Sequence, residues 1–161
     1  MSCHRRLTLL LLFVGGLAGC LSYASRISVS GSGAEREPLS RAEVAQLSAT
    51  VGGVAERFGL QANPKLAALR ETSEESPEYD HRIVVDYISV RGQAPHARVI
   101  VTVGLHKRTE QVTVLIRDLD AWSPTKFTSS LEEAITAALA ARFSAKSIDV
   151  ERGAVGPELG P

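Results

Sequence analysis

Few side chains in this sequence are of types that could do chemistry, and the histidines are the first candidates. His81 and His106 lie next to two segments whose β-branched residues predict neighbouring antiparallel strands. Such strands bring the two imidazoles together at one end of a sheet, with Asp80 and Glu110 nearby. Two histidines and a carboxylate could hold zinc. Because these are loop positions without the fixed spacing of zinc ligands, we expect two solvated histidines, no bound metal and no other cofactor.

A second candidate group is the segment RDLDAWSP, residues 117–124, which follows the last predicted strand of this sheet. Asp118 and Asp120 could act as an acid and base pair, although carboxylates in such a segment more often cap a turn or a helix. The only tryptophan, Trp122, is expected to cover the edge of the core or to contact a ligand or partner. The sequence contains no G-x-S-x-G, P-loop, G-x-G-x-x-G or H-E-x-x-H motif. We therefore expect a protein that is not an enzyme.

The composition limits the classes of partner. The 161 residues include 18 basic and 18 acidic side chains, so the chain lacks the basic excess that binds nucleic acid. Both cysteines, Cys3 and Cys20, lie near the N-terminus. We expect no nucleic-acid partner and no disulfide in the remainder of the chain.

The N-terminal segment has the parts of a secretory signal peptide. Arg5 and Arg6 precede an apolar run of thirteen residues, 7–19, and Cys20 follows. At 1.5 Å per residue, a helix of this length reaches about 20 Å, short of the hydrocarbon core of about 30 Å. A membrane-spanning helix is therefore the poorer interpretation.

Residues 17–20, Leu-Ala-Gly-Cys, resemble the bacterial lipobox, in which a small residue precedes a cysteine. The resemblance implies transfer of diacylglycerol to the Cys20 thiol, cleavage before it, and acylation of the new amino group with a fatty acid such as palmitate. Because Leu21 rather than Asp follows, it also implies an outer-membrane location facing the periplasm. The alternative is an ordinary signal peptide or N-terminal anchor with an incidental cysteine. No motif in the rest of the chain identifies a family.

The chain is predicted to have four parts. They are a signal peptide over 1–19, a lipidated cysteine and flexible tether over 20–38, a single domain over 39–151 and a loose tail over 152–161. The tether is inferred from its Ser and Gly content, although residues 26–30 alternate as in a short strand.

The predicted fold class is α+β, in the order (β)-α-β-β-β-α-β, with an antiparallel sheet of three to four strands and two helices packed on one face. The first helix is predicted to begin at Ser40, with Glu43 completing a capping box, and to end near Gly59. The last helix is predicted to begin near Ser123 or at Ser129. The Gly52-Gly53 pair is explained by close packing of the first helix against the sheet.

The segments between the helices are predicted from local pattern. Residues 65–70 predict a short helix and the acidic stretch 71–80 a solvated loop. The three main strands are predicted over residues 82–91, 97–105 and 111–118. Their expected register places Arg82 opposite His106 and Val103 opposite Val112, which puts one set of apolar side chains on the core face.

The second face of the sheet carries candidate partner contacts. Ile88, Ile100 and Leu115 are expected to be neighbours there, with Arg98 and Arg117 at their edge. An apolar patch rimmed by charge is typical of a docking surface. The alternative is that another part of the chain folds over it.

These observations predict a membrane-anchored, non-enzymatic envelope lipoprotein. Lipid on Cys20 attaches it to the membrane, and the domain binds another protein or supports an envelope complex. The alternative function is a periplasmic module that binds a small molecule or lipid in a pocket between helices and sheet near Trp122.

Overall fold

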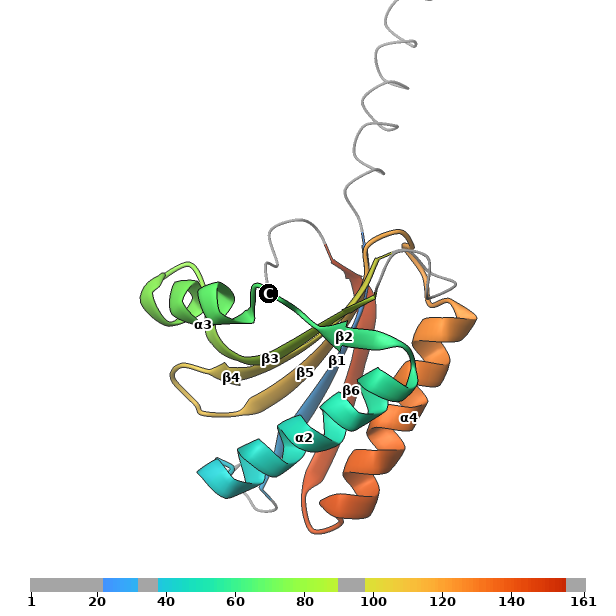
Figure 1. Cartoon of the computed structure of the whole chain (residues 1–161). Helices are drawn as coiled ribbons and strands as arrows, with labels where there is room; N and C mark the ends of the chain where they lie inside the picture. The colour runs from blue at the N-terminus through green and yellow to red at the C-terminus, as the bar shows by residue number, and fades with distance from the viewer. Residues whose placement is uncertain (1–21, 32–37, 90–97, 156–161) are drawn as a thin grey trace, which may run out of the picture.

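The computed structural model describes residues 22–31, 38–89 and 98–155, so Cys20 and His96 lie outside the described residues. Within these ranges the chain forms one six-stranded antiparallel sheet and three helices. In chain order the elements are β1 (Ser22–Ser30), α2 (Arg41–Arg57), β2 (Leu60–Ala62), α3 (Leu66–Glu75), β3 (His81–Ser89), β4 (Val99–His106), β5 (Val112–Asp118), α4 (Lys126–Arg142) and β6 (Ser147–Val155). The strands lie in the spatial order β2-β3-β4-β5-β1-β6 (Figure 1).

The α+β class is confirmed, but the predicted sheet of three to four strands is too small. Residues 22–30, predicted as part of the flexible tether with a short strand over 26–30 as the alternative, form β1, which pairs with β5 on one side and β6 on the other. The serines that suggest a tether alternate with Tyr23, Ile27 and Val29, whose side chains are buried. Similarly, residues 152–155, predicted as loose tail, are the end of β6.

Helices α2 and α4 pack side by side on one face of the sheet, as predicted (Figure 1). The α2 capping box is confirmed, since the Glu43 amide donates to Ser40 Oγ at 3.3 Å and the Ser40 amide to the Glu43 carboxylate at 2.8 Å. Helix α4 begins at Lys126 with Thr125 as its N-cap, rather than near Ser123 or at Ser129. The apolar side chains between helices and sheet are fully buried, among them Leu47, Val51, Leu131, Ile135, Leu139, Ile27, Val101 and Val114.

The third helix, α3, lies along the edge of β3 that β2 leaves uncovered (Figure 1). There the Ile83 amide donates to Ser73 Oγ at 3.0 Å, and Arg70 Nε donates to the Val84 carbonyl at 2.9 Å. An open strand edge exposes such groups to unwanted pairing. The predicted solvated loop over 71–80 is therefore helical as far as Glu75, and Ser73 within it bonds to the edge of β3.

The strand register differs from the prediction in two places. An irregularity between Ile83 and Val85 places His81, rather than Arg82, opposite His106. Val103 lies opposite Val114 instead of Val112, a slip of two residues. Because side chains alternate with a period of two, the slip keeps the same valines on the core face.

Candidate functional site

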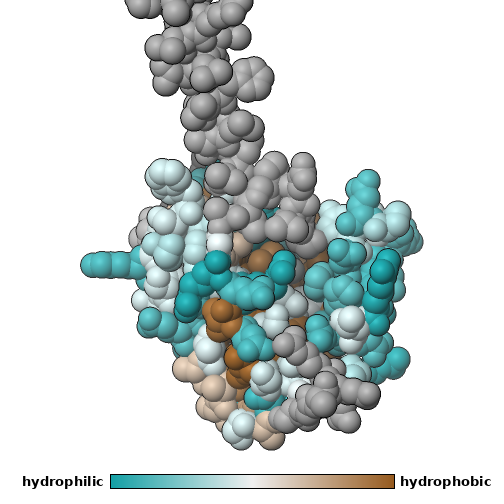
Figure 2. All heavy atoms as spheres, turned by 180° about the vertical axis from the view of Figure 1, so that it is seen from behind, coloured by the Kyte–Doolittle hydropathy of each residue, from teal (hydrophilic) through white to brown (hydrophobic). Residues whose placement is uncertain are grey.

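The predicted docking patch lies on the sheet face opposite α2 and α4. Ile88 and Ile100 are cross-strand neighbours, and Ile100 faces Arg117 on its other side. Leu115 lies diagonally from Ile100, because it pairs with Thr102. The three apolar side chains are half-buried. Figure 2, which views this face, shows apolar groups separated by hydrophilic ones rather than one broad apolar area.

A buried carboxylate lies beside this patch. Asp86 is on the same face and has an exposed fraction of 3 %. The Thr102 hydroxyl donates to its Oδ1 at 2.5 Å, and the Asn63 side-chain amide donates to Oδ2 at 2.7 Å. Both carboxylate oxygens are thus hydrogen-bonded within the protein, which indicates a structural role for Asp86 between β3, β4 and the segment after β2.

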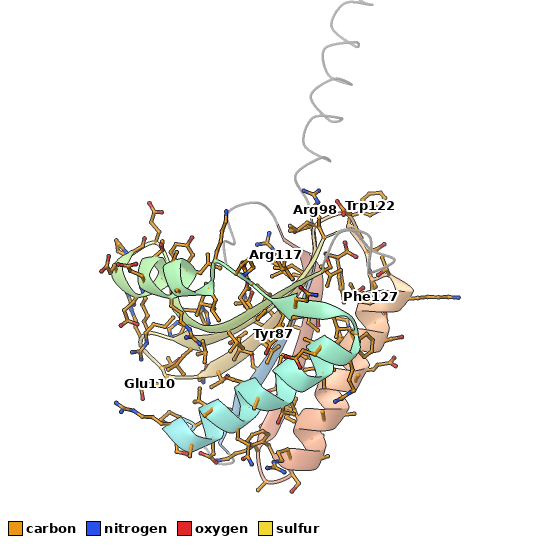
Figure 3. The ribbon with its side chains drawn as sticks, in the orientation of Figure 1. Tyr87, Arg98, Glu110, Arg117, Trp122 and Phe127 are labelled. Carbon is orange, nitrogen blue, oxygen red and sulfur yellow. The ribbon has the colours of Figure 1, made fainter. Side chains whose placement is uncertain are left out.

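Arg98 and Trp122 lie beyond Ile100, at the end of the sheet where β1 begins (Figure 3). Two nitrogens of Arg98 donate to Asp120 Oδ1, at 2.8 and 2.6 Å. Trp122 has an exposed fraction of 74 %, so the prediction that it covers the edge of the core is wrong. Of the six candidate contacts, the structure groups Ile88, Ile100, Leu115 and Arg117, and it groups Arg98 with Trp122.

Hydrogen bonds hold the Trp122 segment to this end of the sheet. The Tyr23 amide donates to the Ala121 carbonyl at 2.6 Å, and the Leu119 amide donates to the Arg98 carbonyl at 3.0 Å. The first residues of β1 are therefore fixed directly against the loop that carries Trp122.

Asp118 and Asp120 do not form the acid and base pair considered above. Asp118 is buried on the core face, and its Oδ1 accepts from the Asp120 amide at 3.1 Å. The Asp120 carboxylate is bound to Arg98. Asp118 thus caps a turn, which is the alternative that the sequence favoured, whereas the ion pair of Asp120 with Arg98 was not expected.

The two histidines do meet, at the end of the sheet opposite Trp122. Their rings are perpendicular, with centroids 5.0 Å apart. Burial lowers the pKa of His81, the charges of His106 and Arg26 act in the same direction, and Asp80 opposes them. Within the part of the chain that the structure describes, no three His, Cys, Asp or Glu side chains are grouped closely enough to bind a metal ion.

An ion pair with a buried carboxylate was missed at the sequence level. Glu132 on α4 faces the core with a side-chain exposure of 4 %, and Arg152 Nε donates to its two oxygens at 2.9 and 3.1 Å. The Tyr23 hydroxyl donates to the same carboxylate at 3.3 Å. Burial raises the pKa of Glu132, but hydrogen bonds from Arg152, Ser25 and Tyr23 outweigh it, and the pKa lies below its usual value.

This buried cluster joins three elements and has the character of a structural clamp. Glu132 comes from α4, Arg152 from β6 and Tyr23 from β1, so the ion pair holds the edge strand and the helix together. The burial of Glu132 could have been predicted from its helical spacing with Thr128 and Ile135, because these positions share the inward face of α4. Arg152 was hidden because it lies in the segment predicted as tail.

No protein-family model matches this sequence, and no curated protein is significantly similar to it. Among the described residues, no helix has both the length and the apolar character needed to cross a membrane.

Proposed function

We propose that this chain is a non-enzymatic envelope lipoprotein, anchored in the outer membrane by lipid on Cys20 and facing the periplasm. The observation that carries the proposal is the sequence Leu-Ala-Gly-Cys at 17–20, placed directly after a short apolar segment with a basic start. Two or three acyl chains hold a protein on a bilayer far longer than one chain does, since each buried CH₂ contributes about 0.8 kcal/mol.

The second part of the proposal is that the domain binds another envelope protein through the patch formed by Ile88, Ile100 and Leu115. Among the described residues, both large helices lie on the opposite face, and α3 lies along the β3 edge. Cross-strand apolar neighbours with Arg117 beside them provide the apolar centre and charged rim that interfaces share.

Metabolic labelling with a radioactive fatty acid tests the anchor. The wild-type chain should incorporate label and fractionate with membranes, whereas Cys20→Ser should incorporate none and should be left unprocessed or soluble. Cys3→Ser is the matched control, because the other cysteine lies within the proposed signal peptide and its loss should leave labelling unchanged. Equal labelling of wild type and Cys20→Ser would contradict the lipid attachment.

Ile100→Lys tests the docking patch. Ile100 is half-buried on the sheet face opposite α2 and α4, and a lysine there can keep its charged end in water. The domain should therefore melt near the wild-type temperature while losing the partner that co-purifies from solubilised membranes. The control is Ser147→Lys, an exposed position on β6 at the far edge of the sheet, which should retain the partner. Undiminished recovery with Ile100→Lys, or a large loss of stability showing that the patch is covered, would contradict docking there.

A further inference from the structure

The end of the sheet at Ser22 combines two features. The first is Trp122, the only large apolar side chain that is exposed among the described residues. The second is the start of β1, whose Tyr23 amide is bonded to the Ala121 carbonyl, adjacent to Trp122. Figure 3 shows Trp122 and Arg98 side by side at this end, with Glu110 at the other end of the sheet.

The length of chain between Cys20 and β1 places this end close to any lipid on Cys20. Because β1 begins at Ser22, only two residue steps separate the lipid-bearing cysteine from the sheet, and they span at most about 7 Å. The flexible tether expected from the sequence does not intervene, because its residues 22–30 are the strand itself. The opposite end of the sheet lies one strand length from the Ser22 end, which is roughly 20 Å for the seven residues of β5.

The chemistry of this end suits a bilayer surface. Tryptophan has an apolar ring with one N–H donor, and it is enriched where membranes meet water. The charge of Arg98 is matched by Asp120, so this end does not depend on anionic lipid for attraction. For an exposed tryptophan held close to a lipidated Cys20, the nearest apolar environment is the bilayer.

From this arrangement we propose that Trp122 inserts into the interfacial region of the bilayer that holds Cys20 and fixes the domain upright, with its strands directed away from the membrane. The inference rests on the proposed lipidation of Cys20. Lipid and Trp122 are then two contacts at one end of the sheet, and together they restrict the tilt of a domain that a single flexible anchor would leave free.

The protein carries its own probe, because Trp122 is the only tryptophan in the chain. The mature lipidated protein is reconstituted into phosphatidylcholine vesicles with or without bromine on the acyl chains near the head groups. Trp122 fluorescence should shift to shorter wavelength on reconstitution, lose intensity in brominated vesicles and become less accessible to aqueous acrylamide.

The matched control moves the tryptophan to the other end of the sheet. In Trp122→Phe/Thr109→Trp the reporter occupies an exposed position in the loop between β4 and β5. Its emission should be the same in brominated and plain vesicles. Equal quenching at both positions would overturn the upright orientation. Absence of quenching at Trp122 in vesicle-bound protein would overturn the insertion, and would favour a protein partner at this end.

Vesicle flotation and the mass of the purified chain separate this inference from the proposed function. A chain that carries no lipid and does not float with vesicles contradicts the lipid anchor, and the inference fails with it. A chain that is lipidated and floats, but whose Trp122 remains in water, contradicts the inference alone.

Discussion

The glycine pair in the middle of α2 offers a sharp test of how this helix packs on the sheet. A Cβ atom at Gly52 would lie 2.3 Å from Tyr87 Oη and 2.9 Å from Tyr87 Cζ, distances that require the ring to move. A Cβ atom at Gly53 would have Arg57 Nη1 as its nearest neighbour, at 3.9 Å. Tyr87 lies beneath α2 (Figure 3) and packs against the core. The two adjacent positions therefore differ in packing but not in helix geometry.

The magnitudes follow from this difference. Replacing Gly by Ala in a helix interior gains about 1 kcal/mol from propensity alone. Gly53→Ala should realise that gain, so its free energy of unfolding should rise by about 1 kcal/mol. Gly52→Ala must also displace Tyr87, and overpacking of this kind costs about 1–3 kcal/mol. Because the propensity gain is common to both, Gly52→Ala should be less stable than Gly53→Ala by about 1–3 kcal/mol.

Urea unfolding followed by far-ultraviolet circular dichroism measures the difference, in a Cys20→Ser background that avoids lipid. Tryptophan fluorescence is a poor probe here, since Trp122 is exposed in the folded state. Tyr87→Phe removes the atom nearest to the new methyl group, so Gly52→Ala should cost less in that background. Equal stability of the two alanine variants, or no relief by Tyr87→Phe, would show that α2 does not approach β3 as described.

The remaining predictions concern charge. Burial lowers the pKa of His81 in the folded state, so the unfolded state binds more protons at mildly acidic pH. The free energy of unfolding should therefore be highest above the unfolded pKa of about 6.5 and should fall as the pH drops toward and through the folded pKa. In His81→Phe the melting temperature should change less between pH 7 and 5 than it does in the wild type. An unchanged pH dependence would exclude His81 as the cause of the loss of stability at low pH. Arg152→Ala should cost about 1–3 kcal/mol, less than the loss of a fully buried pair, because Glu132 loses its cation but keeps the hydrogen bond from Tyr23. Glu132→Gln should cost less, because Arg152 is 58 % exposed and can be hydrated; the reverse order in urea unfolding would contradict the clamp.

Several features fixed by local sequence were predicted correctly, although the start of α4 and the helical part of residues 71–80 were not. The capping box at Ser40 needs only residues three apart, and it forms as expected. The β3-β4-β5 meander joins segments that follow one another, and its alternation of apolar residues identifies the core face. The meeting of His81 and His106 follows from the same pairing.

Features that depend on distant pairing were not predictable in this way. β1 has the composition of a linker, and although residues 26–30 alternate as in a strand, its full length depends on pairing with β5 and β6. The pairing of Glu132 with Arg152 depends on β6 extending past residue 151. The exposure of Trp122 also could not be predicted, since a lone tryptophan beside a strand is more often part of a core.

The position of β1 has a consequence for both proposals. Because β1 pairs with β5 and also with β6, removing the residues after Cys20 would leave β6 without a neighbour in the sheet. In the proposed lipoprotein the anchor and the fold are therefore continuous, and a soluble form of this domain must keep the residues from Ser22 onward. Under the two proposals the docking patch lies near the bilayer, because Ile100 follows Arg98 by two residues, about 7 Å, along the start of β4 at the Ser22 end. A partner that binds Ile88 and Ile100 would then contact the domain close to the membrane surface.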